Sequence, residues 1–215
     1  VLVVAKKAEP ELVDILDVLG VRHITGDQVT SDLPQEVKDF LPELIVTSPG
    51  VRPEHELLAW AKERNIPVWV DIELAWRLRD KTKKVADWIA VTGTNGKTTT
   101  VQMVESMVIA GGKRAIACGN IGTPILDAIR APEGFDALIV ELSSFQLHYL
   151  GEIHPYSSAV LNLADDHLDW HGSFEAYRDA KAKVYENTAV ACVYNTADLA
   201  TEKMVENADV HEGAR

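Results

Sequence analysis

The sequence contains few cysteines and no long apolar run. Its two cysteines, Cys118 and Cys192, each lie inside an apolar stretch, so we expect buried free thiols and a reducing compartment rather than a disulfide framework. No stretch approaches the ~18 consecutive apolar residues of a membrane-spanning helix, and the first residues lack the basic-then-apolar order of a signal peptide. These absences predict a cytoplasmic protein that binds no membrane.

Basic residues are also scarce relative to acidic ones. Asp and Glu total 33 against 21 Lys and Arg, which gives a formal net charge of −12 at pH 7. A surface with this balance repels nucleic acid over most of its area, so we expect no nucleic-acid partner. Any anionic ligand must therefore be held by a local site.

Short β-branched runs alternate with helical patterns along the chain, which is typical of parallel α/β units. The expected strands are residues 1–4, 44–47, 68–70, 88–91, 115–118, 137–140, 159–163 and 189–194, and the expected helices include residues 9–19, 54–63 and 98–110. The polar stretch at residues 80–84 separates two such series and predicts a domain boundary. Because residues 1–4 already have the pattern of a strand and no initiator Met precedes them, we expect the chain to be part of a longer protein.

The clearest functional motif is T-G-T-N-G-K-T-T at Thr92–Thr99, between an apolar strand and a predicted helix. Backbone N–H groups of such a turn, together with the positive N-terminus of the helix, form a concave site for phosphate oxygens. Lys97 would then neutralise charge on the β- and γ-phosphates, and the Thr98 hydroxyl would be a ligand of Mg²⁺.

This loop is shorter than the common pattern G-x-x-x-x-G-K-[ST], whose first glycine would fall at Val91. An ordinary glycine turn before a helix would explain Gly93 and Gly96. It would not explain Lys97 and Thr98 at the start of the helix, so we favour a phosphate site.

Glu141 follows the predicted strand at residues 137–140. In open parallel sheets, ligands bind outside the carboxyl ends of the strands. Glu141 is thus placed to face the same Mg²⁺ as Thr98, although a lone acidic residue at a strand end is also often a helix cap or a solvated side chain.

A helix is predicted to begin after Ser173, a favourable N-cap residue. Its apolar positions are Phe174, Tyr177, Val184 and Tyr185. Spacings of three and four residues place Lys181 on that apolar face. A lysine removed from water is costly unless it is paired, deprotonated or chemically changed, so we expect an anionic partner or a modification; the alternative is a side chain that extends past the core to solvent.

The segment Asn162–His171 follows another predicted strand and contains the run D-D-H-L-D at Asp165–Asp169. Mg²⁺ prefers oxygen ligands. Chemistry alone therefore favours the aspartates as ligands and makes His167 a hydrogen-bonding or capping residue.

Five motifs together resemble those of the Mur ligases, which use ATP to form amide bonds in peptidoglycan synthesis. They are T-G-T-N-G-K-T-T at 92–99, G-N-I-G at 119–122, E-L-S-S-F-Q-L at 141–147, D-H-L-D at 166–169 and Y-R-D-A-K at 177–181. The resemblance spans nearly the whole chain and is most specific from Leu44 onward. Within the family, the glutamine-containing E-L-S-S-F-Q-L is most similar to the member that adds D-glutamate.

Mur ligases have three domains, and the resemblance implies that this α/β chain contains most of the first and much of the second. Residues 1–80 would form a Rossmann-like N-terminal domain for the UDP substrate, incomplete at its start. Residues 81–215 would form a P-loop-type central ATPase domain, incomplete at its end, and the C-terminal domain that binds the amino acid would be absent.

The resemblance also assigns site residues. The ATP phosphates would lie on Gly93, Thr94, Asn95, Gly96, Lys97, Thr98 and Thr99. One Mg²⁺ would be held by Thr98 and Glu141, a second by His167 and a carbamylated Lys181, and the catalytic residues would be Lys97, His167 and Lys181. The UDP-muramoyl substrate would contact Ser48, Gly50, Asn120, Ser143 and Gln146.

The implied reaction uses ATP, UDP-N-acetylmuramoyl-L-alanine and D-glutamate, and it passes through an acyl phosphate. One departure concerns uridine binding, because the family's Asp-Thr-Arg-like contact would fall near Ala5-Lys6-Lys7, which matches only in positive charge. We expect the chain to be inactive alone.

Three other functions stay open. Another P-loop NTPase is one, since N-T-A-D at Asn195–Asp198 resembles the guanine-reading N-K-x-D, but Thr196 replaces its lysine. A sibling ligase such as a folylpolyglutamate synthase is the second. The third is a non-catalytic nucleotide-binding module.

Overall fold

The computed structural model describes residues 1–26, 29 and 33–214, and it divides the chain into two compact units. The first unit comprises the residues up to Ile45 together with Val51–Val68, and the second comprises Val46–Gly50 together with the chain from Trp69 onward. This division lies earlier than the boundary expected after residue 80. The reason is that helix α5 (Asp71–Leu78) packs into the core of the second unit, with Ile72 and Ala75 fully buried there.

The first unit contains a parallel pair of strands joined by a helix. Strands β1 (Leu2–Ala5) and β2 (Arg22–Thr25) pair in parallel, and α1 (Pro10–Val18) connects them, with its first turn started by Pro10. Helices α3 (Gln35–Phe40) and α4 (Glu56–Glu63) also belong to this unit. A further two-stranded sheet pairs β3 (Ile45–Val46) with β4 (Val68–Trp69).

The second unit is built on a five-stranded sheet in the order β6-β7-β5-β8-β9, and every neighbouring pair is parallel. Its strands are β5 (Asp87–Thr92), β6 (Ala115–Gly119), β7 (Ala137–Glu141), β8 (Ser157–Val160) and β9 (Ala191–Tyr194). All five residues of β7 are buried, as expected for a strand covered on both faces of a parallel sheet. The predicted α/β class is therefore confirmed.

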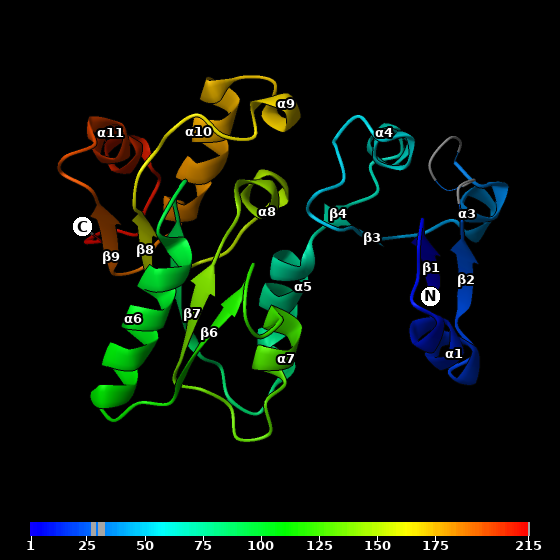
Figure 1. Cartoon of the computed structure of the whole chain (residues 1–215), viewed down its shortest axis with the longest axis horizontal. Helices are drawn as coiled ribbons and strands as arrows, with labels where there is room; N and C mark the ends of the chain where they lie inside the picture. Colours follow the sequence, from blue (N-terminus) through cyan, green and yellow to red (C-terminus); the bar gives the residue numbers. More distant parts are fainter. Residues whose placement is uncertain (27–28, 30–32, 215) are drawn as a thin grey trace. The chain divides into compact units, whose positions relative to one another are not determined.

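Helices cover both faces of this sheet (Figure 1). On one face, α6 (Lys97–Ala110) packs through Val101 against Val91 and Ile139 of the two central strands. On the other face lie α5, α7 (Ile125–Ile129), α8 (Ser144–Tyr149) and α11 (Leu199–Asn207). The remaining elements are the short 3₁₀ turns η1 (Arg79–Lys81) and η2 (Lys183–Tyr185) and the helices α9 (Leu168–His171) and α10 (Phe174–Ala182).

Strand β8 begins and ends earlier than the predicted strand at residues 159–163. Leu161 N still donates to Thr92 O at 3.0 Å, but the strand ends at Val160. Asn162 bonds the loop that follows β5: its carbonyl accepts from Thr94 N at 3.0 Å and its side chain accepts from Asn95 N at 2.9 Å. Three central strands, β5, β7 and β8, thus bring their carboxyl-end loops to one edge of the sheet.

Two predictions based on composition can be compared directly with the structure. Cys118 and Cys192 are buried free thiols, as predicted. Within the part of the chain that the structure describes, no helix is long and apolar enough to cross a membrane.

Candidate functional site

The loop between β5 and α6 depends on two glycines. Gly93 has φ of 153° and Gly96, at the start of α6, has φ of 80°, which are backbone conformations that L-side chains rarely adopt. A Cβ atom on Gly93 would also lie 3.0 Å from Cβ of Leu161. The first N–H groups of α6 have no acceptor within their own helix, so this loop presents backbone donors at the carboxyl edge of the sheet.

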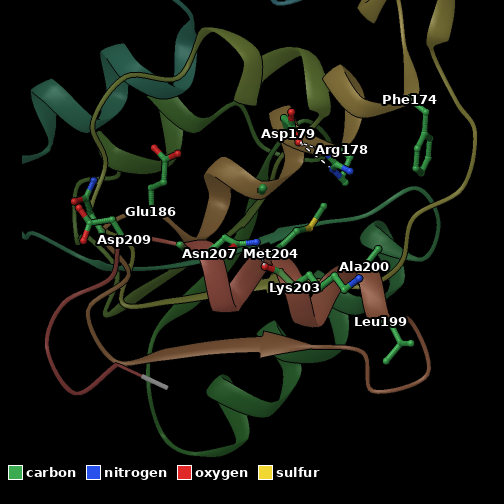
Figure 2. Close-up of a pocket in the computed structure, with 13 residues that line it drawn as sticks. Phe174, Arg178, Asp179, Glu186, Leu199, Ala200, Lys203, Met204, Asn207 and Asp209 are labelled. Carbon is green, nitrogen blue, oxygen red and sulfur yellow. Dashed lines mark hydrogen bonds and ion pairs between the residues drawn. The ribbon is translucent and has the colours of Figure 1, made fainter.

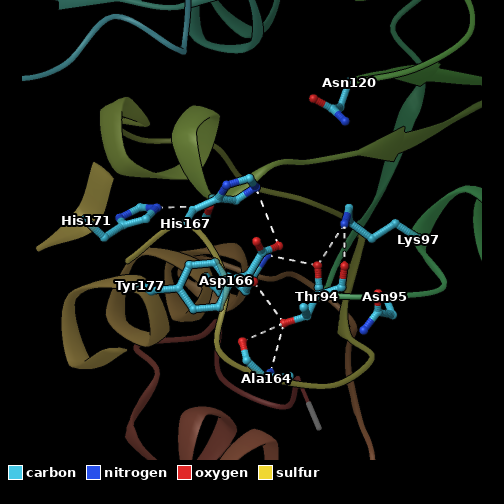
Figure 3. A network of polar contacts seen from close by, with 12 residues as sticks. Thr94, Asn95, Lys97, Asn120, Ala164, Asp166, His167, His171 and Tyr177 are labelled. Atoms are coloured by element: carbon cyan, nitrogen blue, oxygen red, sulfur yellow. Dashed lines mark hydrogen bonds and ion pairs between the residues drawn. The ribbon is translucent and has the colours of Figure 1, made fainter. Parts of the chain in front are cut away.

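The Lys97 ammonium group lies over this loop (Figure 3). Its Nζ donates to the carbonyl oxygens of Gly93, at 3.0 Å, and Thr94, at 2.9 Å. A positive charge therefore lies beside the helix N-terminus, where an anion would be favoured.

Glu141 is buried at 1% exposure and lies at the end of the neighbouring strand β7. One carboxylate oxygen accepts from the Thr98 hydroxyl at 3.0 Å, and the other accepts from Asn120 Nδ2 at 3.0 Å. The solvated or capping alternative for Glu141 is thereby excluded. A hydroxyl and a carboxylate in contact are the oxygen donors that a hard divalent cation takes, so this pair fits Mg²⁺.

Gly119 allows Asn120 to reach Glu141. Its φ is 104°, and a Cβ atom on it would lie 2.4 Å from the carbonyl oxygen of Glu141. The same carbonyl accepts from Asn120 N at 2.9 Å. The turn after β6 therefore needs glycine for its close approach to the end of β7.

Lys181 is buried at 2% exposure on α10, so the alternative of a side chain reaching solvent is excluded. Its Nζ donates to the carbonyl of Gly93 at 2.9 Å and to the hydroxyl of Thr92 at 3.3 Å. These partners are neutral oxygens, and the expected direct anionic partner is not among them. Burial and, to a lesser degree, the charge of Lys97 lower the pKa of Lys181 to about 7, against the opposing effect of Asp166 and Glu141.

His167 begins helix α9 in a left-handed conformation, with φ of 51°, and its side chain makes no capping bond. Its ring packs on Phe145 with centroids 4.6 Å apart, and its Nε2 lies 3.5 Å from a carboxylate oxygen of Asp166. The ring is about half exposed, at 47%. Among residues 1–26, 29 and 33–214, no three His, Cys, Asp or Glu side chains are grouped so that they could hold a metal ion.

Tyr177 joins α10 to the loop between β5 and α6, and nothing in the sequence singled it out as a functional residue. Its hydroxyl lies 2.8 Å from the hydroxyl of Thr94, which also accepts from Ala164 N at 3.0 Å. Figure 3 shows this group of side chains gathered beside Lys97. Burial raises the pKa of Tyr177, against the opposing effect of its bond to Thr94.

His171 is a second residue near the site that was not predicted from the sequence. Its Nε2 lies 3.0 Å from the hydroxyl of Ser144, which is buried at 3% exposure. Burial, followed by the charges of His148, His167 and Lys181, lowers the pKa of His171 to about 4. The ring is thus neutral near pH 7, and it joins α9 to α8.

The residues predicted to contact the muramoyl substrate lie at several loops of the second unit. Ser48 is exposed, and the Gly50 carbonyl accepts from the Trp170 indole at 3.2 Å. Ser143 and Gln146 form a capping box at the start of α8, each satisfying the backbone N–H of the other.

A groove of the second unit, with a volume of about 740 Å³, lies elsewhere. It runs between α10 and α11, and Figure 2 shows side chains of both helices facing it, among them Arg178 and Lys203. None of the predicted site residues lines this groove. The converging polar groups, rather than this groove, therefore define the candidate site.

Comparison with known proteins agrees with this geometry. Residues 91–213 match the family model described as the Mur ligase middle domain. The chain is 58% identical to a UDP-N-acetylmuramoylalanine–D-glutamate ligase of Leifsonia xyli subsp. xyli, over 100% of this chain and 44% of that protein. It is 54% identical to the ligase of the same name from Streptomyces avermitilis, over 93% of this chain and 41% of that protein. The chain thus spans less than half the length of these relatives.

Solved structures share the fold at low sequence identity. The MurF ligase of Thermotoga maritima, in complex with ADP, matches with a TM-score of 0.56 and 15% identity, covering 97% of this chain and 46% of that one. The UDP-N-acetylmuramate:L-alanyl-γ-D-glutamyl-meso-diaminopimelate ligase from Neisseria meningitides matches with a TM-score of 0.56 and 16% identity, covering 97% of this chain and 68% of that one. Because the family model matches residues 91–213, more than half of the chain, this chain belongs to the Mur ligase family.

Proposed function

We propose that the gene product is an ATP-dependent ligase that joins D-glutamate to UDP-N-acetylmuramoyl-L-alanine in the cytoplasm. One observation carries this proposal: Lys97, Lys181 and the Thr98–Glu141 pair all converge on the loop between β5 and α6. The relatives at 54% and 58% identity, which bear the name of this activity, support the choice of substrates.

In the proposed reaction, the alanyl carboxylate attacks the γ-phosphorus of ATP. A bond forms from the carboxylate oxygen to phosphorus as the β–γ bridging bond breaks, which gives an acyl phosphate and ADP. The amine of D-glutamate then attacks the acyl carbon, phosphate leaves, and the amine loses a proton. Two anions must approach each other in the first step, so the main task of the protein is positioning and neutralisation of charge.

Lys97 and the first N–H groups of α6 would bind the β- and γ-phosphates of ATP. The other proposed phosphate contacts are Gly93, Thr94, Asn95, Gly96, Thr98 and Thr99. Since Asn162 holds the backbone of Thr94 and Asn95 at about 3 Å, the loop is shaped in advance and little ordering is needed on binding.

Thr98 and Glu141 would hold Mg²⁺, which when bound supplies positive charge to the phosphate oxygens. His167 and a carbamylated Lys181 would hold a second Mg²⁺. The lowered pKa of Lys181 supports the modification, because a neutral amine can attack CO₂ and lose a proton to form a carbamate. The carbamate would offer two oxygens in place of a buried cation.

Ser48, Gly50, Asn120, Ser143 and Gln146 are proposed to form the surroundings of the UDP-muramoyl substrate. We assign the first unit to binding the UDP part of this substrate. The segments that the relatives possess and this chain does not span would supply the contacts to D-glutamate.

The test is an assay of the protein expressed from the whole gene. ADP release should require both UDP-N-acetylmuramoyl-L-alanine and D-glutamate, and GTP should not replace ATP. A glutamylated folate product, or ADP release without the UDP substrate, would contradict the proposal.

A further inference from the structure

Gln146 bridges two helices of the second unit. Its side chain is on α8, is buried at 3% exposure, and donates through Nε2 to the carboxylate oxygens of Asp71 at 3.2 and 3.4 Å. Asp71 is the first residue of α5 and is 75 positions earlier in the sequence. The contact therefore joins parts of the chain that only the fold brings together.

The other end of the same amide holds Ser143. Gln146 Oε1 accepts from Ser143 N at 3.0 Å and from Ser143 Oγ at 3.2 Å, while Ser143 Oγ accepts from Gln146 N at 3.1 Å. The hydroxyl proton of Ser143 is thus directed at Gln146. A hydroxyl oxygen has two lone pairs, so one lone pair of Ser143 Oγ is left to accept a further bond.

Asp71 fixes which way the amide of Gln146 faces. An ionised carboxylate only accepts hydrogen bonds, so the NH₂ group must face Asp71 and the oxygen must face Ser143. If the amide were reversed, its NH₂ group would meet the N–H of Ser143, and two donors would oppose each other. Both ends of the Gln146 side chain are therefore already used within the protein.

We propose that Asp71 is a positioning residue for the UDP-N-acetylmuramoyl substrate, acting through Gln146 to present Ser143 Oγ as an acceptor to an N–H or O–H group of that substrate. The inference rests on the proposed function. Ser143 lies two residues after Glu141, on the connection that follows β7, so it lies at the same carboxyl edge of the sheet as the loop between β5 and α6. In this arrangement Gln146 orients Ser143, and Asp71 never touches the substrate.

The test uses steady-state kinetics of the protein expressed from the whole gene. Asp71→Leu removes both acceptors and should raise the KM for UDP-N-acetylmuramoyl-L-alanine by about tenfold, the effect of losing one oriented hydrogen bond. The KM for ATP should change by less than about twofold, because the phosphate loop is untouched. The matched control is Asp80→Asn. Asp80 is an exposed acidic residue in the 3₁₀ turn η1, which follows α5, and its substitution should leave both KM values unchanged.

Two further variants, which exchange the donor and the acceptor of the Asp71–Gln146 contact, test the inference if Asp71→Leu does not fold. Gln146→Glu alone places two carboxylates together and should raise the same KM, whereas Asp71→Asn with Gln146→Glu restores a donor facing an acceptor and should lower it again. An unchanged KM for the UDP substrate in the single variants, equal changes in both KM values, or no recovery in the double variant would overturn the inference. A wild-type protein without ligase activity would instead overturn the proposed function.

Discussion

Lys181 shows how burial can change the chemistry of a single residue. Its pKa is lowered to about 7 from the usual 10.5, chiefly by burial. Between these two values the unfolded chain binds a proton at this lysine that the folded chain does not. Stability therefore rises as pH increases through this window.

This difference predicts the behaviour of Lys181→Met. The variant keeps a side chain of similar length and lacks the titrating amine. Its free energy of unfolding at pH 6 should therefore be roughly 1–3 kcal/mol higher than that of the wild type. This difference in the free energy of unfolding should become smaller toward pH 9. Urea titrations of both proteins in CO₂-free buffer would measure it, and parallel pH dependences would contradict the assignment.

His171 predicts a second pH effect, in the acidic range. Its pKa is lowered to about 4 from 6.5, so between these values the unfolded chain binds a proton that the folded chain does not. Stability contributed by the neutral ring is lost as pH falls from 6.5 toward 4. His171→Gln, which can still bond Ser144, should show a weaker loss of stability over this range in thermal melts; an equal loss in both proteins would exclude this role.

The burial of Lys181 could be predicted from the sequence, but its contacts with distant parts of the chain could not. Helical spacing correctly placed Lys181 among buried residues, because Tyr177, Val184 and Tyr185 mark the same face. Its neutral partners on β5 and the following loop could not be predicted, since they lie 88 and 89 positions away. The Asp71–Gln146 contact was hidden for the same reason.

At the scale of elements, the turns at the carboxyl edge of the sheet are set by close backbone approach. Gly119→Ala would place a Cβ atom 2.4 Å from the Glu141 carbonyl at a φ of 104°, so the end of β6 or β7 must move. We expect a loss of roughly 3 kcal/mol or more in the free energy of unfolding. Denaturant titration would measure it.

Gly112→Ala is the matched control for this substitution. Gly112 also has a positive φ, of 81°, but no atom lies within 4 Å of the position its Cβ would take. Only the conformational cost of about 1 kcal/mol should appear. Equal losses in the two variants would show that the contact with Glu141 is unimportant.

The elements themselves were predicted unevenly. Strands β5, β6 and β7 are continuous apolar runs, and the sequence located each to within a residue or two. The shorter helices α7, α8 and α9 were not assigned, because four to six residues give too little periodicity to recognise. Strand β8 was placed too late because the apolar residues Leu161 and Leu163 continue its pattern after the backbone has left the sheet.

At the scale of the whole molecule, the acidic net charge makes a local site necessary for any anion. The formal charge is −12 at pH 7, yet the Lys97 ammonium group and the N-terminus of α6 lie at one loop. Long-range repulsion of a nucleotide is screened by salt, whereas the short, partly buried contacts within the loop are screened much less. Nucleotide affinity should therefore stay constant or rise modestly between 50 and 300 mM salt in a titration, and a steep fall would indicate nonspecific attraction instead.

Every role proposed for the residues of this site depends on the loop between β5 and α6 binding the phosphates of a nucleotide. Calorimetric titration of this chain with Mg–ATP tests that claim most directly. We predict saturable binding with a stoichiometry near one, weakened by about 10- to 100-fold in Lys97→Ala, the range for a lost charge-assisted hydrogen bond. Absence of binding, or the same affinity in wild type and Lys97→Ala, would contradict it.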